Sequence, residues 1–122
     1  MKYFTSALHK VDTMLPTVDV SANTQVIWPP NQKMVEIVAR LSISDNYYPE
    51  PLVVLESIRS NEVLHEGDIQ GTEYGTSDTQ IYLKATRNGN NKEGRIYTIT
   101  YLAKDGTGNS TRVATSVTVQ HE

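Results

Sequence analysis

The sequence contains no cysteine. This absence excludes disulfide bonds, thiolate catalysis and zinc sites built from cysteine. The sequence also lacks clustered charge, because its 14 acidic and 11 basic residues are interspersed and leave a net charge of −3. Since binding to phosphates needs a clustered basic face, we expect no nucleic acid partner.

Long apolar runs are missing as well. No segment approaches the roughly 18 consecutive apolar residues of a membrane-spanning helix, so we expect no membrane insertion. The stretch MKYFTSALHK at the start contains no apolar core of the length found in signal peptides.

The motifs of nucleophilic and zinc-dependent catalysis, GxSxG and HExxH, are also absent. His9, His65 and His121 lie far apart in the sequence, which is typical of solvated side chains. The scattered acidic residues leave a carboxylate pair of the glycosidase type open. We nevertheless predict a non-catalytic protein, because no recognisable catalytic motif supports an enzyme.

Alternation of apolar and polar residues is what the sequence does contain. Val35, Ile37, Ala39 and Leu41 are apolar at every second position, which predicts a strand with one buried face. Similar alternation recurs along the chain, and no segment shows helical periodicity. The expected strands cover residues 17–20, 35–43, 52–58, 81–86, 95–103 and 113–119.

The segments between these strands are rich in turn residues. Asp105-Gly106 lies between the last two strands and is a strong hairpin signal. Residues 60–80 are polar, with at most a short edge strand near Asp68, Ile69 and Gln70. Six or seven short strands in one domain predict an all-β fold, an antiparallel sandwich of two sheets. We assign residues 16–120 to this domain and residues 1–15 to a linker or the end of a preceding module.

Six short motifs follow one another along the chain: WPPNQKMVEI (28–37), SDN (44–46), SNE (60–62), DIQ (68–70), LKATR (83–87) and GRIYTITYLAKDGTGN (94–109). In this order they resemble bacterial immunoglobulin-like domains of the hyalin-repeat (HYR) and PKD-like type. The motif WPPNQKM is similar to the WPPNHKM of that family, with Gln32 where the family usually has histidine. Lys84 and Thr86 also depart from the family pattern.

The resemblance implies an immunoglobulin-like sandwich in a secreted or surface-displayed bacterial protein. Modules of this family occur in tandem or beside enzymatic or adhesive domains, so neighbouring domains of the same chain are the expected partners. Tyr97, near the start of the penultimate strand, matches the tyrosine corner of such sandwiches, which is a structural role.

Exposed aromatic side chains would offer a surface on which a sugar ring can stack. The candidates for ligand binding are Trp28, Tyr47, Tyr48 and Tyr74. The alternative for Trp28 is structural: it covers one end of the core, while Pro29 and Pro30 set the direction of the chain. This alternative is favoured, because Tyr47 and Tyr48 are consecutive and would point to opposite faces of a strand.

Oxygen-bearing side chains at strand ends raise a second binding hypothesis. Calcium takes six to eight oxygen ligands from carboxylates, amides and carbonyls. The candidate ligands are Asp45, Asp68, Asp105 and Asn109, with Glu62 as a further contributor. The alternative is that Asp105 and Asn109 only shape the hairpin through bonds to the backbone. No cofactor is required by the sequence, and calcium is the one that it leaves open.

Together these features predict a structural spacer or adhesion module of an extracellular multidomain protein. The competing prediction is a carbohydrate-binding module attached to a secreted, glycan-active enzyme. A protein or glycan ligand is compatible with both.

Overall fold

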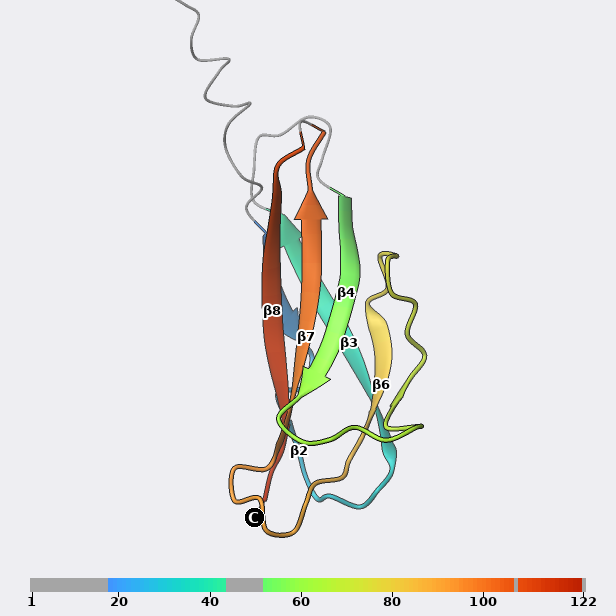
Figure 1. Ribbon diagram of the computed structural model, residues 1–122, viewed down its shortest axis with the longest axis vertical. Helices are drawn as coiled ribbons and strands as arrows, with labels where there is room; N and C mark the ends of the chain where they lie inside the picture. The colour runs from blue at the N-terminus through green and yellow to red at the C-terminus, as the bar shows by residue number, and fades with distance from the viewer. Residues whose placement is uncertain (1–17, 44–51, 107, 122) are drawn as a thin grey trace, which may run out of the picture.

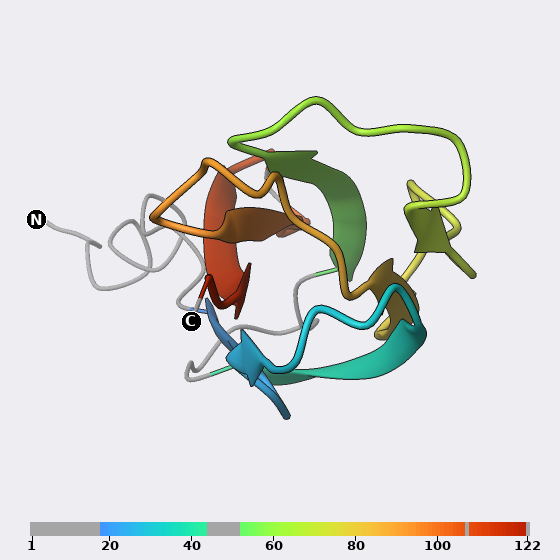
Figure 2. The same cartoon turned by 90° about the horizontal axis from the view of Figure 1, so that it is seen from below.

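A computed structural model describes residues 18–43, 52–106 and 108–121 of the chain. All regular elements in this part are β-strands, arranged in two sheets that face each other (Figures 1 and 2). One sheet has the strand order β1-β3-β6-β5 and the other has the order β2-β8-β7-β4. The strands are β1 (Val18–Ala22), β2 (Val26–Ile27), β3 (Met34–Ile43), β4 (Leu52–Ser60), β5 (Ile69–Gln70), β6 (Gln80–Lys84), β7 (Arg95–Lys104) and β8 (Ser110–Val119).

The predicted all-β sandwich is therefore confirmed, with two differences in detail. The first strand is divided, so that β1 pairs with β3 in one sheet and β2 pairs with β8 in the other. The β2–β8 pair is parallel, whereas the prediction was a wholly antiparallel sandwich. When β1 and β2 are counted as one strand, the order of the sheets matches the constant-type immunoglobulin sandwich.

The core lies between the sheets and is built from alternate residues of each strand. In β7, Tyr97, Ile99, Tyr101 and Ala103 are all fully buried, while the residues between them are half-buried. This is the period of two that the sequence predicts for a strand with one core-facing side. The other members of the same cluster come from the remaining long strands, from β1 and β2, and from the residue after β6: Val18, Ile27, Ile37, Ala39, Val53, Leu55, Ile58, Ile81, Leu83, Ala85, Val117 and Val119.

Two buried tyrosines connect the sheets through their hydroxyl groups. The Tyr97 hydroxyl donates to the carbonyl of Lys84 in β6 at 2.8 Å, and the Tyr101 hydroxyl donates to the carbonyl of Asp78 at 2.7 Å. Burial, with a further contribution from the Asp78 charge, raises the pKa of Tyr101 to about 12. Both phenols therefore stay protonated and keep donating throughout the neutral range.

The chain crosses the sandwich lengthwise between its described ends. We call the end where β7 begins the lower end, as drawn in Figure 1. Val18 pairs with Ile43, at the upper end of β3, and Val119 pairs with Arg95, at the lower end of β7. The described chain thus enters at the upper end and leaves at the lower end, as expected for an odd number of crossings.

Gly94 makes the turn into β7 possible. Its φ angle is 82°, and a Cβ atom there would collide with the carbonyl oxygen of Val119. Its own carbonyl accepts bonds from the side-chain amides of Asn61 at 3.0 Å and Asn91 at 2.8 Å. Glycine is the residue that tolerates both the positive φ and the close backbone approach.

We therefore predict that Gly94→Ala lowers the free energy of unfolding by at least about 2 kcal/mol, through left-handed strain and overpacking. Urea unfolding at neutral pH measures the change. The matched control is Gly89→Ala, because a Cβ atom at Gly89 meets nothing within 4 Å. Equal effects of the two substitutions would contradict the proposed role of Gly94.

Candidate functional site

A buried cluster of charge occupies the lower end of the sandwich. The guanidinium of Arg95, which is 3% exposed, binds two carboxylates. Its Nε atom lies 2.8 Å from Glu62 Oε1, and its Nη1 atom lies 2.7 Å from Asp68 Oδ2. Nη1 also donates to the Tyr97 hydroxyl at 3.2 Å. We call Arg95, Glu62, Asp68 and Tyr97 the Arg95 cluster.

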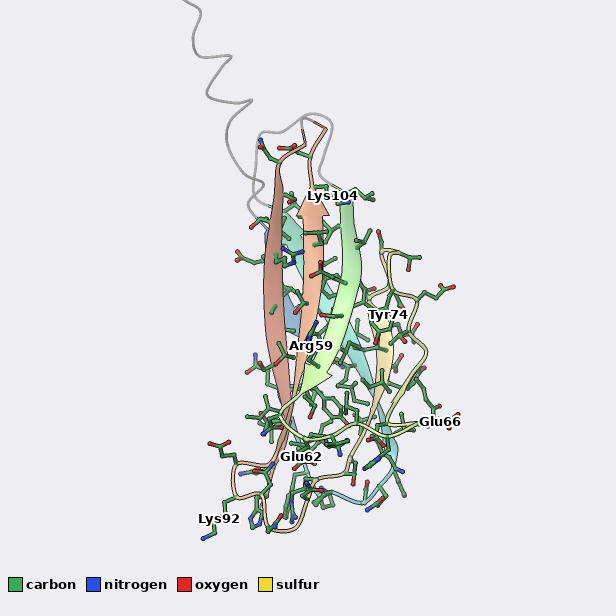
Figure 3. All side chains as sticks on the ribbon, viewed as in Figure 1. Arg59, Glu62, Glu66, Tyr74, Lys92 and Lys104 are labelled. Carbon is green, nitrogen blue, oxygen red and sulfur yellow. The ribbon has the colours of Figure 1, made fainter. Side chains whose placement is uncertain are left out.

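The carboxylates of the Arg95 cluster also accept bonds from loop residues. Glu62 Oε2 accepts from the backbone N–H of Asn88 at 3.0 Å and from the side-chain amide of Asn91. Asp68 Oδ2 accepts from the backbone N–H of His65 at 3.0 Å. The cluster therefore ties the loop after β4 to the loop before β7. Figure 3 shows Glu62 within these lower loops.

The surroundings of Arg95, Glu62 and Asp68 keep all three side chains charged at neutral pH. Burial raises the pKa of Glu62, but bonds from Asn91, Arg95 and Asn88 outweigh it and hold this pKa below its ordinary value. For Asp68, burial also raises the pKa, and the bonds from His65 and Arg95 again lower it below the ordinary value. Burial lowers the pKa of Arg95, yet Asp68 and Glu62 raise it above its ordinary value.

These shifts move the three pKa values away from neutrality. A general acid or base works best with a pKa near the working pH. The Arg95 cluster is therefore suited to holding loops in place rather than to transferring protons.

The predicted calcium ligands do not come together in one place. Asp68 lies at the lower end, where Arg95 begins β7, whereas Asp105 and Asn109 follow the upper end of that ten-residue strand. At about 3.3 Å per residue, β7 separates the two locations by roughly 30 Å. Asp45 lies outside the described residues. Within the described ranges, no three His, Asp or Glu side chains form a metal-binding group.

The upper hairpin shows what Asp105 and Asn109 do. The Asp105 N–H donates to the Asn109 carbonyl at 2.9 Å, and the Asn109 N–H donates to Asp105 Oδ1 at 2.9 Å. These bonds close the turn between β7 and β8, as the structural alternative expects. β3 and β7 both run toward this end, so calcium binding by Asp105 together with Asp45 stays a prediction.

The two candidate aromatic residues that the structure describes, Trp28 and Tyr74, also lie apart. Trp28 follows β2 at the lower end, and Tyr74 belongs to the turn beside β4, whose Gly75 N–H donates to the Leu55 carbonyl at 2.8 Å (Figure 3). Tyr47 and Tyr48 lie outside the described residues. Trp28 is 56% exposed and Tyr74 is 50% exposed. The structural role of Trp28 at one end of the core stays a prediction.

A shallow depression lies along the β1–β3 pair. Its volume is about 210 Å³, smaller than the roughly 300–1,000 Å³ of small-molecule sites. The lining residues are Asp19, Val20, Ser21, Arg40, Leu41 and Ser42. The depression is therefore too small to suggest a ligand by itself.

Arg95 is the residue that the sequence reading missed. It precedes Tyr97 and Ile99 at a period of two, so it occupies a core-facing position of the strand. A charge on a buried face needs partners, because burying an unpaired charge is very costly. A charged residue at a core-facing position of a strand could therefore have indicated a buried ion pair. The sequence does not show which carboxylates bind it.

Comparison with protein-family models, with curated proteins and with solved structures gives no match. The described part of the chain contains no helix that is long and apolar enough to cross a membrane. Function has to be inferred from the geometry of the chain itself.

We predict that Arg95→Met lowers the free energy of unfolding at pH 7 by about 3–5 kcal/mol, because two buried carboxylates lose their countercharge. The matched control is Arg112→Met, which removes the exposed Arg112–Glu56 pair. That loss should lower the free energy of unfolding far less, because water and salt screen an exposed ion pair. Urea unfolding of both variants measures the difference.

The pH dependence should change sign between the native protein and Arg95→Met. The pKa values of Glu62 and Asp68 are lowered by folding, so their stabilisation is present above about pH 4.3 and lost as the pH falls through the folded values. Without Arg95, burial should raise these pKa values, and the variant should become more stable as the pH falls toward 5. Parallel pH profiles of the two proteins would contradict this account.

Proposed function

We propose that this chain is a non-catalytic immunoglobulin-like module of a secreted or surface-displayed bacterial protein. Its work is mechanical: it holds neighbouring domains apart and offers them, or a ligand, a contact surface. The observation that carries this proposal is the path of the described chain, which enters at one end of the sandwich and leaves at the other. Modules of this geometry extend as a rod when they are joined in tandem.

The exit of the chain is held firmly, which supports a spacing role. Arg87 Nη2 donates to the carbonyl of His121 at 2.8 Å, and the Gln120 N–H donates to the Ile27 carbonyl at 3.1 Å. The His121 ring lies 3.0 Å from the carbonyl of Gly89. A chain end fixed by several bonds sets the direction in which a following domain would lie.

The resemblance to hyalin-repeat and PKD-like modules supports the extracellular and adhesive parts of the proposal. Calcium at the upper loops would stiffen the junction with a neighbouring domain, and its ligands would include Asp105 and Asn109. The Arg95 cluster stiffens the lower end without any added ion.

We predict one cooperative thermal transition in the absence of any ligand, because the ion pairs at the lower end are satisfied internally. Calorimetry with calcium and with a chelator measures it, and an unchanged melting temperature argues against the calcium site. Turnover of a glycan or peptide that disappears when one acidic residue is replaced would contradict the non-catalytic proposal.

One observation favours carbohydrate binding as a second candidate function. Trp28 exposes more than half of its surface on a loop that is tied to the sheet. The Gln32 N–H donates to the Ala85 carbonyl at 2.8 Å, and the Lys33 N–H donates to Asn31 Oδ1 at 3.1 Å. An exposed indole on a loop that is fixed in this way can stack on the face of a sugar ring. Carbohydrate platforms usually use two or three aromatic side chains.

The carbohydrate alternative predicts that Trp28→Ala abolishes retention on polysaccharide affinity gels. Leu52→Ala is the matched control, because Leu52 is an exposed apolar side chain that is not among the aromatic candidates. Both changes should alter the free energy of unfolding by no more than about 0.5 kcal/mol, as is usual for surface positions. Retention that survives Trp28→Ala would exclude this site.

A further inference from the structure

Exposed sheet edges carry unpaired N–H and C=O groups that can pair with another chain. Most edges of this sandwich are protected. β2 and β5 have only two residues each. The longer edge strand β4 contains a register shift between Leu55 and Ser57, and a neighbouring turn covers it. The Leu55 N–H donates to the Thr76 carbonyl at 2.7 Å, and the Ser77 hydroxyl donates to the Val53 carbonyl at 2.8 Å.

Two longer strands remain: β1 is the five-residue edge strand of its sheet, and β8 is a ten-residue strand that is only partly covered by β2. β2 pairs with it only at Thr118 and Val119. The N–H groups of Thr118 and Gln120 point to the β2 side, where they donate to Gln25 and Ile27. Because backbone groups alternate along a strand, the N–H and C=O groups of every even-numbered residue of β8 face the same side. Among the described residues, none bonds to this edge between Ser110 and Ser116. We call residues 110–116 the open edge.

The views agree on the position of the open edge. In Figure 1, β8 borders the described part of the sandwich on the left, and β1 lies behind it. Figure 2 shows the same two strands in different layers. β1 therefore lies beside β8 in the opposite layer, and its hydrogen-bonded neighbour is β3 rather than β8.

The open edge also lacks the sequence features that usually prevent a strand from pairing with another chain. Its sequence, STRVATS, contains no proline or glycine, and its pairing with β7 runs without a register shift. Its one charged side chain, Arg112, binds Glu56 at 2.7 Å on the outer face of the sheet. A long, regular and weakly charged edge is a template for strand addition.

We propose that the open edge is a self-association site, at which a second copy of this chain adds its own β8 antiparallel to the first. The two four-stranded sheets then form one continuous sheet across a two-fold axis. The axis passes through Val113, so that Val113 of each copy faces Val113 of the other. The remaining pairs are Ser110 with Ser116, Thr111 with Thr115, and Arg112 with Ala114.

The register follows from three constraints. Hydrogen-bonded pairs must join even-numbered residues, because only these face the edge. Centring the pair on Ala114 would place Ser110 opposite Thr118, which β2 already covers. Centring it on Arg112 would place the two Arg112 side chains opposite each other, and directly opposed like charges are destabilising. The axis at Val113 avoids both problems and uses all seven residues of the open edge.

The absence of cysteine makes a direct test possible, because one introduced cysteine can form only an intermolecular disulfide. Val113 pairs with itself at a non-hydrogen-bonded position, where Cα atoms lie about 4.5 Å apart. This separation falls within the disulfide range of roughly 4.4–6.8 Å. Val113→Cys should therefore form a disulfide-linked dimer on mild oxidation. Thr111→Cys and Thr115→Cys should cross-link when mixed, but neither should cross-link alone.

Two further variants test the pairing without any disulfide. Ala114 is exposed and faces Arg112 of the second copy in the proposed register. Ala114→Glu should tighten the dimer and Ala114→Arg should weaken it, each by roughly 2- to 30-fold for two symmetric charge pairs. Sedimentation equilibrium of the wild type and both variants measures the dissociation constants.

The control for cross-linking is Glu66→Cys, at an exposed loop position far from β8 (Figure 3). The proposal is overturned if the wild type stays monomeric at millimolar concentration and Val113→Cys cross-links no faster than the control. Cross-linking by Thr111→Cys alone would overturn the proposed register. These outcomes do not depend on whether the module acts as a spacer.

Discussion

One buried guanidinium holds the lower end of this sandwich together. Arg95 sits on the core-facing side of β7, where a charge is tolerated only with close countercharges. Glu62 and Asp68 supply these countercharges from a single loop. Both carboxylates also accept hydrogen bonds from backbone N–H groups of the surrounding turns. Because every partner is buried with Arg95, the loops must close in one arrangement for the core to form.

The stiffness of the module follows from that closed end. The Arg95 cluster includes Tyr97, whose hydroxyl donates to a carbonyl of β6 in the opposite sheet. The turn before β7 also contacts the end of β8, because the backbone of Gly94 lies against the carbonyl of Val119. The lower end thus joins both sheets, two loops and the departing chain. Among the described residues, none bonds to the edge of β8 between Ser110 and Ser116, and this is the edge at which we propose association.

The sequence predicts the long strands well, because β3, β7 and β8 show the period of two that half-buried strands require. It does not predict β2, since two residues are too few for periodicity and only pairing with β8 defines them. It does not predict the ion pair of Asp68 for a similar reason. Its partner Arg95 is 27 residues away, and such a contact exists only in the folded chain. The exposure of Trp28 likewise depends on how the loop after β2 packs.

The central claim is that the Arg95 cluster makes the lower loops part of the cooperative core. Native-state hydrogen exchange tests it most directly, at the N–H groups of His65 and Asn88, which bind the carboxylates of the cluster. If the claim is correct, these loop amides exchange only through global unfolding, with the same opening free energy as the amide of Ile99 in β7. Exchange through local opening, at a free energy well below that of Ile99 and insensitive to denaturant, would contradict it.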